Sequence, residues 1–336
     1  ESPGVGAFLT TVTKKTLITA PAYFDADAVA LFQQLGEVTA KELSREKLLQ
    51  EVQDYEILAI RVDTIVDKKI IDAATKLKVI ATGTTGINHI DVEYAKKKVI
   101  EVISLQGANT NSTAEHALAL LLSLARKIPA AHSSLLSGRW HRADFIGTEL
   151  YGKKLGVIGF GRIGKDIAVL AQAFGMHILA YDPYLKDEVF YQAKVKRLTT
   201  IEDIFLEADM ITLHLLLTEE TRGMVNKEKL QLMKPTSFLI NCSRGEVLSE
   251  ADLLQVLEEG KIAGAALDVF SAEPLPAEHP LLNYARKNDN LIITPHIAGS
   301  TREAVHEAGR FVATKTLEFF NKYHPSVKDT IQTKSQ

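Results

Sequence analysis

A run of glycines in the middle of the chain, between an apolar strand and a helix, constrains the fold most. Residues 159–164 read Gly-Phe-Gly-Arg-Ile-Gly and follow the apolar segment Leu155–Ile158. Residues 162–174 have helical periodicity, and a second apolar run at 177–181 ends before Asp182. Strand, glycine turn, helix and strand in this order predict a βαβ unit that binds a dinucleotide.

The three glycines have different expected roles in this unit. The first permits a tight turn, the second lets backbone N–H groups approach a pyrophosphate at the positive end of the helix, and the third allows close helix–sheet packing. The candidate cofactor-binding residues of the turn are Gly159, Gly161, Arg162, Ile163 and Gly164. Asp182 lies 23 residues after the first glycine, where a carboxylate would bind the adenosine ribose hydroxyls and repel a 2′-phosphate. We therefore expect NAD rather than NADP.

The rest of the chain alternates short apolar runs with longer segments of helical period, the pattern of parallel strands joined by crossover helices. The expected strands are Thr16–Ala20, Ile57–Ile60, Val79–Thr82 and Val99–Ile103, then Lys154–Gly159, His177–Tyr181, Met210–His214, Ser237–Asn241, Ala263–Asp268 and Leu291–Thr294. The expected helices are Ala26–Leu35, Arg45–Val52, Lys68–Thr75, Val92–Lys97, Ala114–Arg126, Arg162–Phe174 and Thr301–Lys322. The chain is therefore predicted to be α/β. The polar patch Asn109–Thr113 is expected to cap the fifth of these helices and to mark a domain boundary.

Composition excludes several classes of protein. The 336 residues carry 39 basic and 42 acidic side chains, and this net charge of −3 does not favour nucleic acid as a partner. A single cysteine, Cys242, forms neither an internal disulfide nor a thiolate metal cage, and no metal site is expected. The apolar stretches are too short to span a membrane, and the N-terminus does not resemble a signal peptide, so we expect a cytoplasmic protein. The lysines at 96–98 and 328–334 are expected to be solvated.

Three side chains near expected strand ends suit the oxidation of a secondary alcohol, which needs a base for the proton and a cation for the carbonyl that forms. His296 lies just beyond the strand at 291–294, at the edge where α/β sheets bind ligands. Arg244 offers a planar fork for a carboxylate and a carbonyl oxygen. Glu273, in a loop after a strand, could orient the imidazole and favour its protonated form. The alternative interpretations are an ordinary core or surface histidine, a surface arginine and a solvated glutamate.

A softer candidate is the segment Thr82–Asp91, which follows an expected strand and precedes a helix. Its backbone N–H groups could form a small anion nest for a substrate carboxylate, with Thr84, Thr85 and Gly86 as the candidate residues.

Taken together and in order, these motifs resemble the D-isomer-specific 2-hydroxyacid dehydrogenases. The resemblance covers about residues 14–325 and is carried by the segments 159–164, 233–245, 266–270, 272–274 and 295–301. The closing His-Ile-Ala-Gly-Ser-Thr is most similar to the phosphoglycerate dehydrogenase branch, in a short form without the C-terminal regulatory domain of many members.

The resemblance implies two doubly wound parallel-sheet domains with a cleft between them. A flavodoxin-like substrate domain would comprise residues 14–108 plus 297–330, and a Rossmann NAD-binding domain residues 109–296. The hinges would lie near residues 107–111 and 295–299.

It also implies roles for individual residues. Arg244, Glu273 and His296 match the catalytic set, Thr113 and Asp268 match positions that line the nicotinamide, and Arg61 matches an arginine that phosphoglycerate-type members direct at the substrate. His214 would belong to the adenine-side wall, and Cys242 would pack beside the adenine or ribose pocket. Ile87 departs from the family pattern, and Asp63 adds negative charge near Arg61, so the substrate stays open.

The expected activity is NAD-dependent interconversion of a D-2-hydroxy acid and its 2-keto acid, with D-3-phosphoglycerate and 3-phosphohydroxypyruvate as one pair. A glyoxylate or hydroxypyruvate reductase is an alternative, and an NAD-sensing, corepressor-like binding protein is another. By resemblance, the helix at 114–126 and the arm at 137–140 would pair two subunits in a homodimer.

Overall fold

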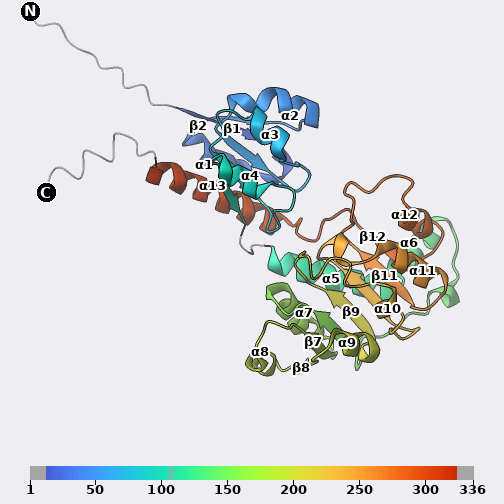
Figure 1. The fold of residues 1–336 in the computed structure, drawn as a ribbon. Helices are drawn as coiled ribbons and strands as arrows, with labels where there is room; N and C mark the ends of the chain where they lie inside the picture. Colours follow the sequence, from blue (N-terminus) through green and yellow to red (C-terminus); the bar gives the residue numbers. More distant parts are fainter. Residues whose placement is uncertain (1–12, 106, 108, 324–336) are drawn as a thin grey trace, which may run out of the picture. The chain divides into compact units, whose positions relative to one another are not determined.

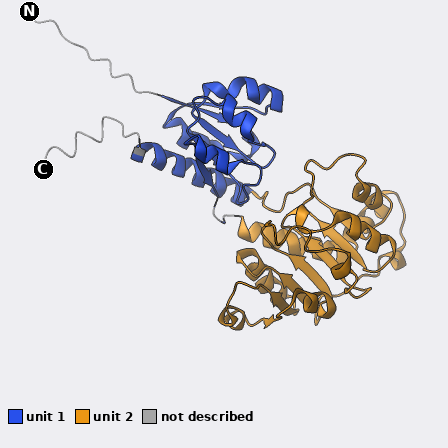
Figure 2. Cartoon of the chain, in the orientation of Figure 1, with its two compact units in different colours: residues 1–108, 302–336 blue, residues 109–301 orange. Residues whose placement is uncertain are grey.

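The computed structural model describes residues 13–105, 107 and 109–323 (Figure 1). Contacts divide the chain into two compact units, which Figure 2 colours separately. Unit 1 comprises residues 1–108 and 302–336, and unit 2 comprises residues 109–301. Each unit has a parallel sheet with helices on both faces, which confirms the predicted fold class.

Unit 1 contains a five-stranded parallel sheet in the order β2-β1-β3-β4-β5, the flavodoxin-like arrangement. Its strands are β1 (Lys14–Ile18), β2 (Gly36–Ala40), β3 (Ile57–Ile60), β4 (Val79–Thr82) and β5 (Glu101–Ser104). Every residue of β3 and β4 is buried, as expected of central parallel strands covered on both faces.

Helices cover both faces of this sheet. They are α1 (Ala26–Gln33), α2 (Arg45–Glu51), α3 (Lys68–Ala73), α4 (Val92–Lys97) and α13 (Arg302–Tyr323). The first four begin after an aspartate or serine whose side chain accepts a backbone N–H, which satisfies part of the open first turn. Helices α1 and α13 pack together on one face, and α2, α3 and α4 pack on the other.

Unit 2 contains a seven-stranded parallel sheet in the order β12-β11-β10-β9-β6-β7-β8. The strands are β6 (Lys154–Ile158), β7 (His177–Tyr181), β8 (Lys196–Arg197), β9 (Met210–Leu213), β10 (Phe238–Asn241), β11 (Gly264–Leu267) and β12 (Leu291–Ile293). The order reverses between β6 and β9, so the switch point, where such sheets bind ligands, lies at the carboxyl end of β6.

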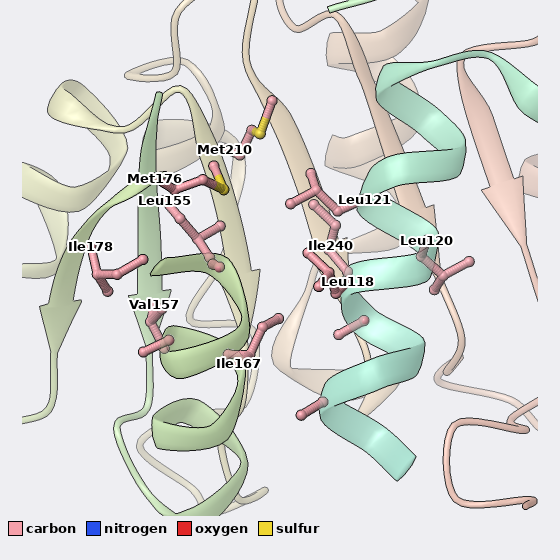
Figure 3. Packing of buried hydrophobic residues seen from close by; sticks show 14 of the residues in the cluster. Leu118, Leu120, Leu121, Leu155, Val157, Ile167, Met176, Ile178, Met210 and Ile240 are labelled. Atoms are coloured by element: carbon pink, nitrogen blue, oxygen red, sulfur yellow. The ribbon is translucent and has the colours of Figure 1, made fainter. Parts of the chain in front are cut away.

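The helices of unit 2 are α5 (Thr110–Ala125), α6 (Ile128–Leu136), α7 (Arg162–Ala173), α8 (Asp187–Gln192), α9 (Ile201–Glu207), α10 (Lys227–Leu230), α11 (Glu250–Glu258) and α12 (Pro280–Ala285). One face of the sheet is covered by α5 and α7, whose apolar side chains meet those of the strands (Figure 3). The other face is covered by α9, α10, α11 and α12.

The structure departs from the sequence predictions at two edge strands, at the start of α5 and in six helices of unit 2 that were not predicted, α6 and α8–α12. These helices have four to nine residues, too few for a clear helical period. The edge strands β2 and β8 were not predicted, because β2 is only half buried and β8 has two residues, so neither carries a continuous apolar run. Helix α5 begins at Thr110, four residues before the predicted start at Ala114. The polar patch is therefore the first turn of the helix, where Ser112 and Thr113 are buried and the Ser112 hydroxyl pairs with that of Thr301 at 2.8 Å.

Candidate active site

The glycine turn lies at the carboxyl end of β6, directly before α7. Gly159 has φ of +88°, and a Cβ there would lie 2.4 Å from the backbone oxygen of His214, so only glycine fits. A Cβ on Gly164 would lie 2.2 Å from the oxygen of Gly159, which explains the close approach of α7 to the turn. Gly161 starts α7 with no side chain to cap it, and the space around its Cβ position is open.

Asp182, at the end of β7, is held against this turn. Its Oδ2 accepts a hydrogen bond from the backbone N–H of Phe160 at 3.0 Å, and its Oδ1 accepts one from Tyr184 N–H at 3.0 Å. Arg162 and Ile163 are the first two residues of α7. The helix start has no side-chain cap, the space at Gly161 is open, and a carboxylate lies next to the turn. These features fit a bound dinucleotide.

His214 follows β9, and its Nε2 lies 2.9 Å from the Thr212 hydroxyl. Burial lowers the pKa of His214 from 6.5 to about 3, so the imidazole is neutral at physiological pH.

Cys242, after β10, is 6% exposed, and burial together with the charge of Asp268 raises the pKa of its thiol well above the usual value. The thiol is therefore protonated and suits packing rather than reaction. Thr113 is buried in the first turn of α5, where its hydroxyl donates to the oxygen of Asn109 at 2.9 Å.

His296 and Glu273 form a direct pair. The imidazole Nδ1 lies 2.7 Å from Glu273 Oε2, while Glu273 Oε1 accepts the backbone N–H of Phe270 at 2.9 Å. The two side chains are 30% and 29% exposed, which leaves them accessible to a small molecule. The pair comes from the loops that follow β11 and β12, two neighbouring strands of a parallel sheet.

Arg244 follows β10, the next strand of the same sheet. Its Nη1 donates to the backbone oxygen of Ser243 at 2.6 Å. Burial lowers the pKa of the Arg244 guanidinium, and the negative charges of Glu273 and Glu246 oppose that effect. The side chain remains a cation, and Glu273 is one of the charges that act on it. The three predicted catalytic side chains thus arise from consecutive strands β10, β11 and β12.

Asp268 supports the loop that carries His296. The carboxylate is fully buried: Oδ1 accepts from the Thr294 hydroxyl at 2.5 Å and from Ile297 N–H at 2.9 Å, and Oδ2 accepts from Ala298 N–H at 2.8 Å. Burial alone would raise the pKa of Asp268, but the hydrogen bonds from His116, Thr294 and the two N–H groups lower it overall. Asp268 is therefore ionised, and it accepts several hydrogen bonds from other residues of unit 2.

The backbone of His296 is left-handed, with φ of +52°. This conformation is uncommon for a residue with a Cβ, and surrounding contacts must hold it. The backbone N–H groups of Ile297 and Ala298 donate to the Asp268 carboxylate and hold this conformation. Sequence reasoning missed His116, whose Nε2 lies 3.4 Å from Asp268 and 3.3 Å from the Thr294 hydroxyl, because it belongs to a helix whose pattern otherwise indicates core.

The substrate candidates of unit 1 cluster around Arg61, which follows β3. Its Nη1 donates to the backbone oxygen of Gly83 at 2.9 Å, and the guanidinium lies 4.3 Å from the centre of the Tyr23 ring. Burial lowers the pKa of Arg61, and Tyr23 and Asp63 oppose that effect.

The loop after β4 lies beside this arginine. The Thr84 hydroxyl donates to the oxygen of Gly86 at 2.8 Å, which closes a tight turn, and Thr85 lies between them. The structure therefore brings Arg61 and this loop together within unit 1.

Two further predictions concern absences. Within the described residues, no group of histidine, cysteine or acidic side chains is arranged to hold a metal ion. Among the helices of that same part of the chain, none combines the length and the apolar character needed to cross a bilayer. The lysine-rich segment 328–334 and Ala108, in one of the expected hinges, lie outside the described residues.

Comparison with known proteins identifies the class. The sequence model of the D-isomer specific 2-hydroxyacid dehydrogenase, NAD binding domain, matches residues 118–298. The chain therefore belongs to the D-isomer specific 2-hydroxyacid dehydrogenases, and the resemblance seen in its motifs is confirmed. Its unit 2 contains the NAD-binding domain of that family.

Individual relatives place the chain within the family. It is 44% identical over 300 residues to D-3-phosphoglycerate dehydrogenase of Methanocaldococcus jannaschii, a match covering 89% of this chain and 56% of that protein. The chain thus spans about half the length of the curated relatives it matches. Among solved structures, the TT0316 protein of Thermus thermophilus aligns with a TM-score of 0.82 and 33% identity, covering 93% of this chain and 98% of that one. D-Lactate dehydrogenase of Aquifex aeolicus, complexed with NAD and lactic acid, aligns with a TM-score of 0.78 and 29% identity, covering 92% and 95%.

Proposed function

We propose that the chain is an NAD-dependent D-2-hydroxyacid dehydrogenase, which interconverts a D-2-hydroxy acid and its 2-keto acid. The observation that carries the proposal is the 2.7 Å contact between His296 and Glu273, in the loops after two adjacent strands of the NAD-binding unit. Arg244 follows the third strand of that series. An acid–base pair and a cation are the groups that this oxidation requires from the protein.

In this proposal, His296 transfers the proton of the substrate hydroxyl, and Arg244 binds the negative charge of the substrate carboxylate. When bound, NAD would supply the hydride chemistry at the substrate carbon, in either direction. Protonated His296 donates from Nε2 to the keto oxygen, because Nδ1 faces Glu273. Glu273 stabilises the imidazolium by its opposite charge, and Arg244 grips the substrate carboxylate and polarises the carbonyl. In oxidation the same imidazole, neutral at first, takes up the hydroxyl proton.

The cofactor proposal is a preference for NAD over NADP. The Asp182 carboxylate, fixed beside the glycine turn by Phe160 N–H, supports it because that carboxylate would repel a 2′-phosphate. Asp182→Ala should narrow the ratio of kcat/KM with NADH to that with NADPH. Equal kcat/KM values for the two cofactors in the parent protein would refute the preference. We also propose that Thr113 and Asp268 line the nicotinamide, and that His214 and Cys242 lie at the adenine end of the cofactor.

The substrate proposal is D-3-phosphoglycerate and 3-phosphohydroxypyruvate. The names of the curated relatives support it, and so does a cation at Arg61 beside the loop of Thr84, Thr85 and Gly86. A second candidate is an unphosphorylated substrate such as glyoxylate or hydroxypyruvate. It is favoured by Asp63, whose negative charge acts on Arg61 and would oppose a phosphate.

Steady-state oxidation of NADH against a panel of keto acids tests both candidates. The panel comprises 3-phosphohydroxypyruvate, hydroxypyruvate, glyoxylate, pyruvate and 2-ketoisocaproate. We expect the highest kcat/KM with the phosphorylated compound. A preference for an unphosphorylated acid would select the second candidate, and no turnover with any of the five would favour an NAD-sensing binding protein.

We also propose that two copies associate as a homodimer and that the protein is cytoplasmic. The apolar residues of α5 pack mainly inside unit 2, whereas α6 and the arm after it expose large apolar side chains. Leu136, Trp140 and Ile146 are 76%, 73% and 77% exposed in the single chain. The exposure of several large apolar side chains in one stretch of the chain supports a protein partner. Sedimentation should give a dimer at micromolar concentration, and a monomer would argue against it.

A further inference from the structure

The carboxylate of Glu250 contacts the loop that carries Glu273 at two residues, one on each side of Glu273. Residues 268–279 connect β11 to α12, and Glu250, the first residue of α11, contacts Ser271 and His279 of this connection. Its Oε1 accepts the backbone N–H of Ser271 at 2.6 Å and the Ser271 hydroxyl at 2.9 Å. Its Oε2 lies 3.2 Å from Nε2 of His279.

The partners of His279 define which nitrogen carries its proton. The backbone N–H of Leu281 donates to Nδ1 at 3.4 Å, at the start of α12, so Nδ1 acts as an acceptor. The proton must then be on Nε2, which donates it to Glu250. The two side chains are 19% and 12% exposed, so water competes only weakly for this contact. A neutral imidazole therefore serves both partners at once.

We propose that Glu250 and His279 are positioning residues for the acid–base pair. Both act through the loop, whose residue Glu273 must direct Oε2 at the imidazole Nδ1 of His296 at 2.7 Å. The other oxygen of Glu273 is held by the N–H of Phe270, one residue before Ser271. Release of the His279 end leaves the Glu273 carboxylate free to turn toward water. This inference rests on the proposed function.

A test of this inference must leave unchanged the other charged groups near the His296–Glu273 pair. Glu273 and Glu246 both act on Arg244, in the loop after β10. Asp268 accepts the N–H of Ile297, the residue after His296, and His116 of α5 contacts Asp268. The variants below alter none of them.

Two substitutions at one position separate positioning from stability. His279→Gln places an amide nitrogen near the former Nε2 and keeps a donor for Glu250, but it loses the acceptor for Leu281. His279→Asn places an oxygen near the former Nδ1 and keeps that acceptor, but it cannot reach Glu250. Each variant loses one hydrogen bond, so their melting temperatures should fall by similar amounts.

The readout is the pH dependence of kcat for keto-acid reduction. His279→Asn should move the descending limb toward lower pH by about one unit, because the Glu273 carboxylate is no longer held against the imidazolium. His279→Gln should retain the parent profile, and KM for the keto acid should change little in either variant. Glu250→Gln turns an amide N–H toward His279 and should behave like His279→Asn.

Glu273→Gln is the reference. If it shifts the limb while His279→Asn and Glu250→Gln both follow the parent profile, the positioning role is wrong and the proposed function stands. If Glu273→Gln leaves the limb unmoved, the acid–base assignment itself fails. Adding His279→Asn to Glu273→Gln should shift the limb no further, and an additional shift would mean that His279 acts by another route.

Discussion

The two units share an architecture but differ in what their strand ends carry. Unit 2 places an imidazole, a carboxylate and a guanidinium after three consecutive strands, and the imidazole and carboxylate are about 30% exposed. Unit 1 places one arginine after β3 and ties it to its own backbone and to a tyrosine ring. The same kind of sheet therefore carries an acid–base pair, His296 and Glu273, in unit 2 and a cation held by its neighbours, Arg61, in unit 1. The contrast illustrates that function lies in the side chains at a site and not in the fold.

The contrast between the units would be wrong if the side chains of unit 2 did not catalyse the proposed reaction. His296→Ala should lower kcat by about 10³-fold, the middle of the range for a lost general acid, while the affinity for NADH stays unchanged. Single-turnover reduction and fluorescence titration with NADH measure the two quantities. Turnover close to that of the parent protein would mean that another residue donates the proton.

Arg244→Lys tests the second part of the unit 2 set. The variant keeps the charge but loses the planar fork, so KM for the keto acid should rise and kcat should fall, for a combined loss of about 100-fold in kcat/KM. Arg222→Lys, at an exposed position of the same unit, is the matched control. A change in KM alone would show that Arg244 binds the ground state without polarising the carbonyl.

Arg61→Ala tests the role assigned to unit 1. If its cation selects a phosphorylated substrate, kcat/KM for 3-phosphohydroxypyruvate should fall by about tenfold or more, while that for glyoxylate changes little. Arg45→Ala removes another arginine of unit 1, one that pairs with Asp67 at the surface, and should leave both values unaltered. Equal losses with both acids would indicate that Arg61 supports the fold of unit 1 rather than selectivity.

The last expected effect is on stability rather than on turnover, and it concerns His214 of unit 2. Its pKa is lowered from 6.5 to about 3, so the unfolded chain binds more protons between these values. The stabilisation is complete above pH 6.5 and is lost as pH falls toward 3, by about 2 kcal/mol between pH 7.5 and 5. Urea unfolding at the two pH values should show this loss, and His214→Gln should reduce it. An unchanged loss in the variant would contradict the assignment.

The sequence was sufficient for the central strands and the glycine turn, because each is signalled by neighbouring residues, whereas the catalytic roles of Arg244, Glu273 and His296 stay predictions. Strands β3, β4 and β7 run over the predicted residues, since β3 and β4 are buried apolar runs and β7 is buried at its three central residues. Contacts between distant residues were not predictable in this way. Asp268 and His116 are 152 positions apart, and Glu250 and Ser271 are 21 apart, so only the folded arrangement brings them together.

Edge strands were missed for a related reason. The residues of β2 are half-buried or exposed, and the two-residue β8 pairs only with β7 among the described strands. The early start of α5 likewise reflects tertiary burial of Ser112 and Thr113, which overrides the low helix propensity of serine and threonine.

The left-handed backbone of His296 has a consequence for how this chain could diverge. A histidine at that position costs on the order of 1 kcal/mol relative to glycine, so folding alone gives no reason to retain it. Once a copy of the gene no longer needed turnover, selection for stability would favour glycine or asparagine there, while the buried Asp268 and the glycine turn would persist. If the proposed role of His296 holds, the residue at this one position in descendants of the chain would separate those that keep the acid–base group from those that have lost it.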